Sequence, residues 1–435
     1  MLILSGVSYT HPNKELLFSN VDISLNAGEK AALIGNNGTG KSTLLKIIAG
    51  QLAATGNIKI ASDSYYVPQH FGQYDQMTIA EAIGVAGKLN ALKEILGGNV
   101  SEVNLDILNE DWTIEERCFE AFQHWGLNNL DLAQPMHTLS GGQKTKVFLA
   151  GIQVQEPPLV LLDEPSNHLD ISGRQLLYEY IQTTNHSLIV VSHDRILLNL
   201  LTVMYELSKD GIHVYGGNYD FYALQKQNEN EALQQDLKSK EKAYRKAKET
   251  ERETMERQQK LDARGKRKQE KSGLPTISMN TFRNNAEKST AKMKAVHEGK
   301  LGTLSKEIDD MRKGMPGIDK MRLAFNDSNL HKGKILVSGK DVNFNYGNGN
   351  VWQHSLQFEI TSGSRIAVKG DNGSGKTTLI KMILGELQPT EGIITRNINR
   401  AVYIDQDYSL VDNSRTVYEQ VQQFNTSALA EHEVK

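Results

Sequence analysis

The chain has 435 residues, of which 39% are hydrophobic, so it is long enough for two or three domains with ordinary cores. It has no run of 18 or more apolar residues and no charged segment before an apolar one at its N-terminus, so we expect neither a membrane domain nor a signal peptide and place the protein in the cytoplasm. Cys118 is the only cysteine, which excludes an intrachain disulfide and a metal cluster built on cysteines.

Residues 1–222 alternate short apolar strands with helical stretches, which predicts an α/β domain with a mainly parallel sheet. An apolar strand at 31–34 runs into a glycine-rich phosphate loop, and a helix with apolar spacing follows from Ser42 to Ala49. The glycines let backbone N–H groups surround phosphates, the lysine reaches the β and γ phosphates, and the hydroxyl of Ser42 binds Mg²⁺. The predicted nucleotide contacts are Gly35, Asn36, Asn37, Gly38, Thr39, Gly40, Lys41, Ser42 and Thr43.

Two residues outside this loop are further candidates. Tyr9 precedes the second apolar strand, where its ring could stack on a nucleotide base. Gln69 follows a short strand and is a candidate for contact with Mg²⁺ or with the attacking water. Either residue alone is a weak signal.

A second group of motifs follows in the same domain. The run Leu139, Ser140, Gly141, Gly142 and Gln143 opens a helix and can present N–H groups and a hydroxyl to a γ-phosphate. The apolar strand 159–162 then delivers Asp163 to Mg²⁺ and Glu164 to the attacking water. Another strand ends near His193, which could hydrogen-bond the γ-phosphate.

In this order, the motifs resemble those of the ATP-binding cassette ATPases, over the whole of residues 1–222. The resemblance implies that the LSGGQ run of one cassette closes on the phosphate loop of another, with ATP between them. The tyrosine- and glycine-rich segment Tyr215–Tyr222, which leads into a charged helix, is similar to that of the ABC-F family. Members of that family are twin-cassette proteins without membrane domains, and the resemblance implies a ribosomal partner, at the 23S rRNA and the peptidyl-tRNA region.

Residues 223–333 form the predicted linker. Between Lys226 and Lys334 there are 27 basic and 17 acidic residues, although the whole chain has a net charge of −3. Mixed three- and four-residue apolar spacing predicts one long helix from about Phe221 to Arg267, a turn at Ser272–Pro275 and a second helix that ends near Gly314. We therefore expect a basic antiparallel helical hairpin.

Positive charge is concentrated at the expected tip of the hairpin, where residues 257–288 include nine basic and three acidic side chains. Such a tip suits contacts with the RNA backbone that are independent of sequence and sensitive to salt. A plain structural spacer with a solvated face is the alternative. The RNA-binding candidates are Arg264, Lys266, Arg267, Lys268, Lys271 and Arg283.

Residues 334–435 begin a second cassette. Tyr346 or Phe344 is its base-stacking candidate, and Gln406 follows Lys376 by 30 residues. Thr377 and Gln406 are its Mg²⁺ candidates. Its predicted nucleotide contacts are Gly370, Asp371, Asn372, Gly373, Ser374, Gly375, Lys376, Thr377 and Thr378. No LSGGQ run, no apolar strand ending in Asp-Glu and no strand-end histidine equivalent to His193 follows Gln406, so we expect the second cassette to be truncated and incomplete.

These patterns predict P-loop ATP-binding cassette domains joined by a helical hairpin, and an ATPase that uses ATP and Mg²⁺. Because neither composite site is complete, we expect this chain alone to hydrolyse ATP weakly, unless two chains pair through their first cassettes. The expected role is that of a translation factor or of an antibiotic-resistance protein that protects the ribosome. The alternatives are the ATPase subunit of a membrane transporter, which would not explain the basic hairpin, and a DNA-repair ATPase.

Overall fold

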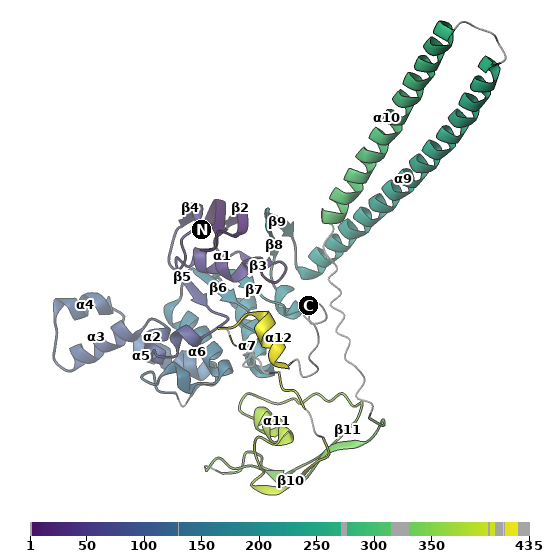
Figure 1. Ribbon diagram of the computed structural model, residues 1–435. Coiled ribbons are helices and arrows are strands. Elements are labelled where there is room, and N and C mark those ends of the chain that lie inside the picture. Colours follow the sequence, from purple (N-terminus) through teal and green to yellow (C-terminus); the bar gives the residue numbers. More distant parts are fainter. Residues whose placement is uncertain are drawn as a thin grey trace. The chain divides into compact units, whose positions relative to one another are not determined.

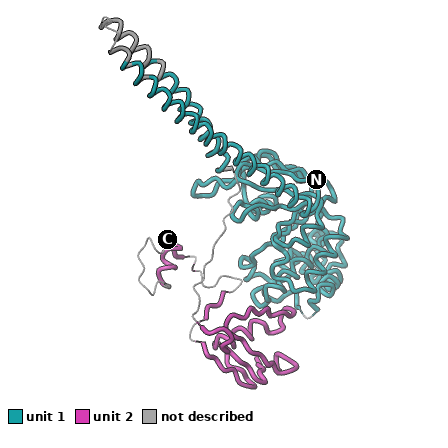
Figure 2. The backbone as a smooth tube through the Cα atoms, turned by 90° about the vertical axis from the view of Figure 1, so that its right-hand side faces the viewer, with its two compact units in different colours: residues 1–323 teal, residues 324–435 magenta. Residues whose placement is uncertain are grey.

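The computed structural model of the chain describes residues 2–128, 130–270, 276–314, 330–347, 349–398, 401–404, 412 and 414–424. Its contacts divide into two compact units, residues 1–323 and 324–435 (Figure 2). Among the described residues, no helix is both long enough and apolar enough to cross a bilayer.

Unit 1 is built on a six-stranded sheet with the strand order β5-β6-β7-β3-β8-β9 (Figure 1). The first five are parallel and β9 is antiparallel to β8. The strands are β3 (Lys30–Ile34), β5 (Ser64–Val67), β6 (Leu159–Asp163), β7 (Ser187–Val191), β8 (Val203–Ser208) and β9 (Gly211–Gly216). Every residue of β6 and β7 is buried, as expected for parallel strands that are covered on both faces. The predicted α/β fold is confirmed.

A second, three-stranded antiparallel sheet has the order β2-β1-β4. It consists of β1 (Leu2–Thr10), β2 (Leu16–Leu25) and β4 (Thr55–Ile60). Its apolar side chains, with Leu2 and Leu4 fully buried or nearly so, share one core with α1 (Lys41–Ile48) and one face of the main sheet. Helix α1 is thereby held between the two sheets, and the phosphate loop at its N-terminus is supported from both sides.

The remaining helices of the cassette contribute to the core on the other face of the main sheet. This core includes Trp125 and Phe148, both at most 2% exposed. The helices are α2 (Ile79–Ala82), α3 (Ala86–Leu96), α4 (Glu102–Leu108), α5 (Ile114–His124), α6 (Gly141–Gln155), α7 (Ile171–Thr183) and α8 (Arg195–Leu198). Short 3₁₀ turns at Gly72–Tyr74 and Met136–Thr138 lie on either side of α2 to α5 in the sequence.

The linker forms the predicted hairpin of two long helices, α9 (Tyr219–Glu270) and α10 (Thr276–Gly314), which run antiparallel side by side (Figures 1 and 2). At about 1.5 Å per residue, the 52 residues of α9 span roughly 78 Å. Ion pairs join the helices, from Lys240 to Glu307 and, at 2.8 Å, from Arg312 to Glu241. The predicted turn at 272–275 lies outside the described residues.

Unit 2 contains a three-stranded antiparallel sheet of order β11-β10-β12, with β10 (Ile335–Asn343), β11 (Leu356–Thr361) and β12 (Glu391–Arg396), and the helices α11 (Lys376–Leu384) and α12 (Val417–Phe424). Its segment 365–369 precedes the second phosphate loop, as β3 precedes the first, but it is not a strand. Ile366 is 57% exposed, whereas Leu33 in β3 is fully buried. The reason is that β3 lies between β7 and β8, and the described part of unit 2 has no such neighbouring strands.

Candidate nucleotide site

The first phosphate loop connects the end of β3 to the start of α1. Gly40 caps α1 with a left-handed backbone (φ +97°), and a Cβ atom there would lie 2.6 Å from the side chain of Leu17, so only glycine fits. The Lys41 ammonium donates hydrogen bonds to the carbonyl oxygens of Gly35 at 2.9 Å and Asn36 at 3.1 Å. Burial lowers the pKa of Lys41, and the charges of Glu164 and Asp163 oppose this shift. The lysine is thus held at the loop where phosphate would bind.

The end of β6 brings Asp163 to this loop, although 121 residues separate it from Ser42. The Ser42 hydroxyl donates to Oδ1 of Asp163 at 3.1 Å, and the Tyr66 hydroxyl donates to Oδ2 at 3.0 Å. Asp163 is 1% exposed, and this burial raises the pKa of its carboxyl, while the two hydrogen bonds act in the opposite direction. A carboxylate and a hydroxyl beside a phosphate loop are the oxygen ligands that suit Mg²⁺, which otherwise keeps water and phosphate ligands.

Glu164 follows directly and has a left-handed backbone (φ +51°), which is strained for a residue with a Cβ atom. Its own N–H donates to Val191 O at 2.8 Å, which ties it to β7. The carboxylate accepts a hydrogen bond from the His193 N–H at 3.3 Å and lies 3.5 Å from His193 Nε2. Burial raises the pKa of Glu164, partly offset by His193. Such a carboxylate can accept a proton from water more readily than an exposed one.

The parallel strands explain why these residues meet. Asp163 ends β6, His193 follows β7, Gln69 follows β5, and the phosphate loop follows β3. The carboxyl ends of parallel strands share one edge of a sheet, where ligands of open α/β sheets bind. Gln69 is half-buried at this edge.

The LSGGQ run begins α6. Ser140 is its N-cap and accepts a hydrogen bond from the Gln143 N–H at 3.3 Å, while the Gln143 side chain accepts one from the Ser140 N–H at 2.9 Å. Leu139 and Gly142 are buried, whereas Ser140 and Gly141 are exposed. The capping box therefore fixes the backbone and leaves the polar start of the helix open to solvent.

The second phosphate loop repeats the geometry of the first. The Lys376 ammonium donates to the carbonyl oxygens of Gly370 at 2.8 Å and Asp371 at 2.6 Å, and Gly375 caps α11 with φ +87°. Trp352 Nε1 donates to the Ser374 carbonyl oxygen at 2.9 Å. Among its predicted partners, Gln406 lies outside the described residues.

The two base-stacking candidates lie in different surroundings. Tyr9 in β1 packs against the rings of His11 and Phe18, with centroids 5.5 and 6.3 Å away. Tyr346 is 66% exposed, and its hydroxyl lies 2.9 Å from the hydroxyl of Thr378, directly after the second phosphate loop. Phe344 packs edge-on against Tyr346 at 4.7 Å. The ring of Tyr346 thus has the more open position.

Of the predicted RNA contacts, Arg264 and Arg267 are exposed on α9 near the far end of the hairpin. Lys271 lies outside the described residues, as do the side chains of Lys266, Lys268 and Arg283. The base of the hairpin is fixed to the cassette by Glu206 on β8, which accepts hydrogen bonds from Lys226, Tyr222 and Tyr215.

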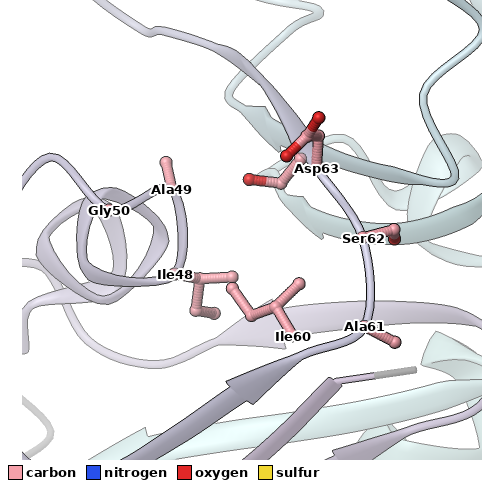
Figure 3. Close-up of a pocket in the computed structure, with 8 residues that line it drawn as sticks. Ile48, Ala49, Gly50, Ile60, Ala61, Ser62 and Asp63 are labelled. Carbon is pink, nitrogen blue, oxygen red and sulfur yellow. The ribbon is translucent and has the colours of Figure 1, made fainter.

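A surface hollow lies near the opposite end of α1 from the phosphate loop (Figure 3). It is lined by Ile48, Ala49 and Gly50, by Ile60 at the end of β4, and by residues 61–64. The hollow contains none of the predicted site residues. The nucleotide site is therefore defined by the phosphate loop and the ends of the strands, and not by this hollow. In the described part of the chain, no three His, Cys, Asp or Glu side chains form a cluster that could hold a metal ion.

The motifs did not single out Tyr66 or Glu206, which the structure places at the nucleotide site and at the hairpin base. A signal for the tyrosine is present in the repeat, because Tyr66 precedes Gln69 by three residues as Tyr403 precedes Gln406. No comparable signal marks Glu206, whose role depends on strand pairing.

Comparison with known families matches residues 18–167 and 353–435, more than half of the chain, to the family described as "ABC transporter". ATP-binding protein Uup of Haemophilus influenzae is 30% identical over 434 residues, covering 93% of this chain and 60% of that protein. The putative ATP-binding protein YdiF of Bacillus subtilis is 28% identical over 433 residues, covering 94% and 62%. This chain therefore spans about three fifths of the length of these two relatives.

ABC transporter F family member 2 of Dictyostelium discoideum is 28% identical over 432 residues, covering 95% of this chain and 66% of that protein. Among solved structures, a dimeric ATP-binding cassette in a post-hydrolysis state bound to ADP and Pi is similar, with 22% identity and a TM-score of 0.40 over 50% of this chain and 98% of that chain.

Proposed function

The chain belongs to the ABC transporter family of ATP-binding cassette ATPases, and from this premise we propose that it is an ABC-F-type protein that uses ATP to control its association with the ribosome. The observation that carries the ATPase part is the meeting of Lys41, Ser42, Asp163 and Glu164 at one sheet edge. The basic hairpin and the similarity to a relative named as an F family member support the ABC-F part.

In the proposed reaction, Lys41 leaves the loop carbonyls and contacts the β and γ phosphates of ATP. Ser42 and Asp163 would hold Mg²⁺, which when bound neutralises phosphate charge. Glu164 orients the attacking water and accepts its proton, because burial raises the pKa of its carboxyl and the carboxylate is fixed by the His193 N–H. The exposed start of α6 at Ser140 would meet a nucleotide held by another cassette.

The cytosol is the compartment that we propose, and the ribosome is the partner. Lys and Arg side chains on the hairpin would contact RNA phosphates, which makes binding dependent on salt and largely independent of sequence. The proposed domains are the cassette at 1–222, the hairpin at 223–333 and the second cassette at 334–435.

Co-sedimentation with ribosomes tests the proposal directly. The chain is sedimented with ribosomes at moderate salt, with ATP, with a non-hydrolysable ATP analogue or without nucleotide, and we expect the most binding with the analogue. A variant with Arg264, Lys266, Arg267 and Lys268 replaced by Gln should bind less. A matched control replaces four lysines nearer the hairpin base, Lys238, Lys242, Lys246 and Lys248, and removes the same charge.

Equal loss in both variants would show that total charge, and not the tip, determines binding. Nucleotide binding without any ribosome binding would refute the ribosomal role and leave the ATPase assignment intact. Co-purification with a membrane permease would favour the transporter alternative. Preferential binding to duplex DNA over ribosomes would favour the repair alternative.

A further inference from the structure

Tyr66 is placed beside the proposed metal ligand Asp163 by the pairing of two strands. In β5 and β6 the Cα atom of Tyr66 is opposite that of Leu161, and Asp163 lies two residues further along on the same face. A phenol is long enough to extend along the strand to that carboxylate. Its hydroxyl donates to Oδ2 of Asp163 at 3.0 Å in a buried position.

The ring of Tyr66 is packed in the core beneath α1, with Leu44, Leu45 and Leu161 among the members of the same cluster. Tyr66 as a whole is 8% exposed. The ring therefore cannot swing away without disturbing that core, and its hydroxyl is held at one point next to Asp163.

The two oxygens of Asp163 thus have different partners. Ser42 donates to Oδ1 at 3.1 Å, on the side of the phosphate loop, while Tyr66 donates to Oδ2 from the core. If Ser42 and Asp163 held a metal ion, the Tyr66 hydrogen bond to Oδ2 would still fix the rotation of the carboxylate. Without it, Asp163 would have to be ordered at the moment of metal binding.

The geometry points to Tyr66 as a positioning residue that orients Asp163 for the divalent metal ion bound with the nucleotide. This inference rests on the proposed ATP-binding function and adds a residue to it. The same Tyr-to-Gln spacing at Tyr403 and Gln406 shows that the second cassette carries a tyrosine at the equivalent place in the sequence.

The test is a binding cycle with mant-ATP, a fluorescent ATP analogue, in a Lys376→Ala background so that the first loop is measured. The affinity is determined in EDTA and in saturating Mg²⁺, and the ratio gives the contribution of the metal. Tyr66→Phe keeps the ring and removes the hydroxyl. We expect unchanged affinity in EDTA, and a contribution of Mg²⁺ that is reduced roughly tenfold, the equivalent of one hydrogen bond to a charged group.

Tyr65→Phe is the matched control. Tyr65 is the neighbouring residue on the same strand, its ring lies in the core on the opposite face, and its buried hydroxyl has no hydrogen-bond partner in the described part of the chain. This variant should retain the Mg²⁺ contribution of the parent chain. Equal thermal midpoints for the two variants would show that packing is intact.

The outcomes separate the two claims. If the parent chain does not bind mant-ATP, the proposed function fails. If the parent chain binds it and Tyr66→Phe retains the full Mg²⁺ contribution, or loses affinity equally in EDTA and in Mg²⁺, the positioning role is refuted while ATP binding stands.

Discussion

Replacing Glu206 should loosen the hairpin at its base while the cassette stays folded. Glu206 lies on β8, and its carboxylate accepts hydrogen bonds from Lys226 at 2.8 Å and from the hydroxyls of Tyr222 and Tyr215 at 3.2 Å each. All three donors follow β8 in the chain, and two of them lie in the first turns of α9. Glu206→Ala removes the one acceptor that these three groups share.

The size of the effect follows from the exposure of the partners. A hydrogen bond to a charged group contributes about 1.5–3 kcal/mol, but three bonds to one carboxylate are not additive. The side chains of Glu206 and Lys226 are 19% and 30% exposed, so water replaces part of what is lost. We therefore expect a loss of about 2–3 kcal/mol in the local stability of the hairpin base. At a factor of ten per 1.4 kcal/mol, this is roughly a 30- to 150-fold increase in local opening.

Hydrogen exchange of the backbone amides measures that opening. Amides in the first three turns of α9 should exchange faster by this factor, and those of β6 and β7 should not change. Glu229→Ala is the matched control, because its more exposed carboxylate has longer contacts with two of the same groups, the Tyr215 hydroxyl at 3.3 Å and the Lys226 ammonium at 3.7 Å. Equal exchange in the two variants, or faster exchange throughout the sheet, would contradict the role given to Glu206.

Three further predictions concern residues at the two nucleotide sites. Burial raises the pKa of Glu164 above its ordinary value of 4.5, so the folded chain binds this proton more tightly than the unfolded chain does. The free energy of unfolding therefore falls as the pH rises from 4.5 through the raised pKa of the folded chain. Glu164→Gln should therefore raise the thermal midpoint at pH 7.5 more than at pH 4.5, and the weak ATP turnover expected of this chain should be lost. Equal shifts at both pH values would count against this. Because Trp352 contacts the second phosphate loop, its fluorescence should change when ATP is added. Trp352→Phe should remove this change, whereas the fluorescence change of mant-ATP on binding should remain. Gly40→Ala should destabilise the cassette by about 1–3 kcal/mol in urea unfolding, since the added Cβ strains the backbone and meets Leu17; an unchanged midpoint would show that the loop adapts.

The fold was predictable because each motif occurs in a strand or helix whose own pattern is clear. The buried strand before Gly35, the apolar helix after it and the long charged helices all appear in the structure. The segment 365–369 was harder to predict, because a strand forms only when it pairs with a neighbouring strand, and the sequence of the segment alone cannot supply that partner. Its exposed Ile366 shows how much of the burial of β3 comes from β7 and β8.

The distances within the site required the order of the strands. The motifs predicted Ser42 and Asp163 as metal ligands. Their contact, however, depends on the positions of β3 and β6 in one sheet. Tyr65 and Tyr66 illustrate what the sequence alone does not give, which is the register between β5 and β6. Adjacent strand residues point to opposite faces, so only the register against β6 decides which hydroxyl meets the carboxylate.

The same strand order gives the first phosphate loop a physical route to the hairpin. In the pairing of β3 with β8, Ile34 is opposite Glu206, and a Cβ atom on Gly35 would lie only 2.6 Å from the carbonyl oxygen of Leu207. The loop backbone therefore packs against β8, where Glu206 accepts hydrogen bonds from Lys226 and Tyr222. Packing therefore connects the loop backbone to β8, and Glu206 connects β8 to the base of α9.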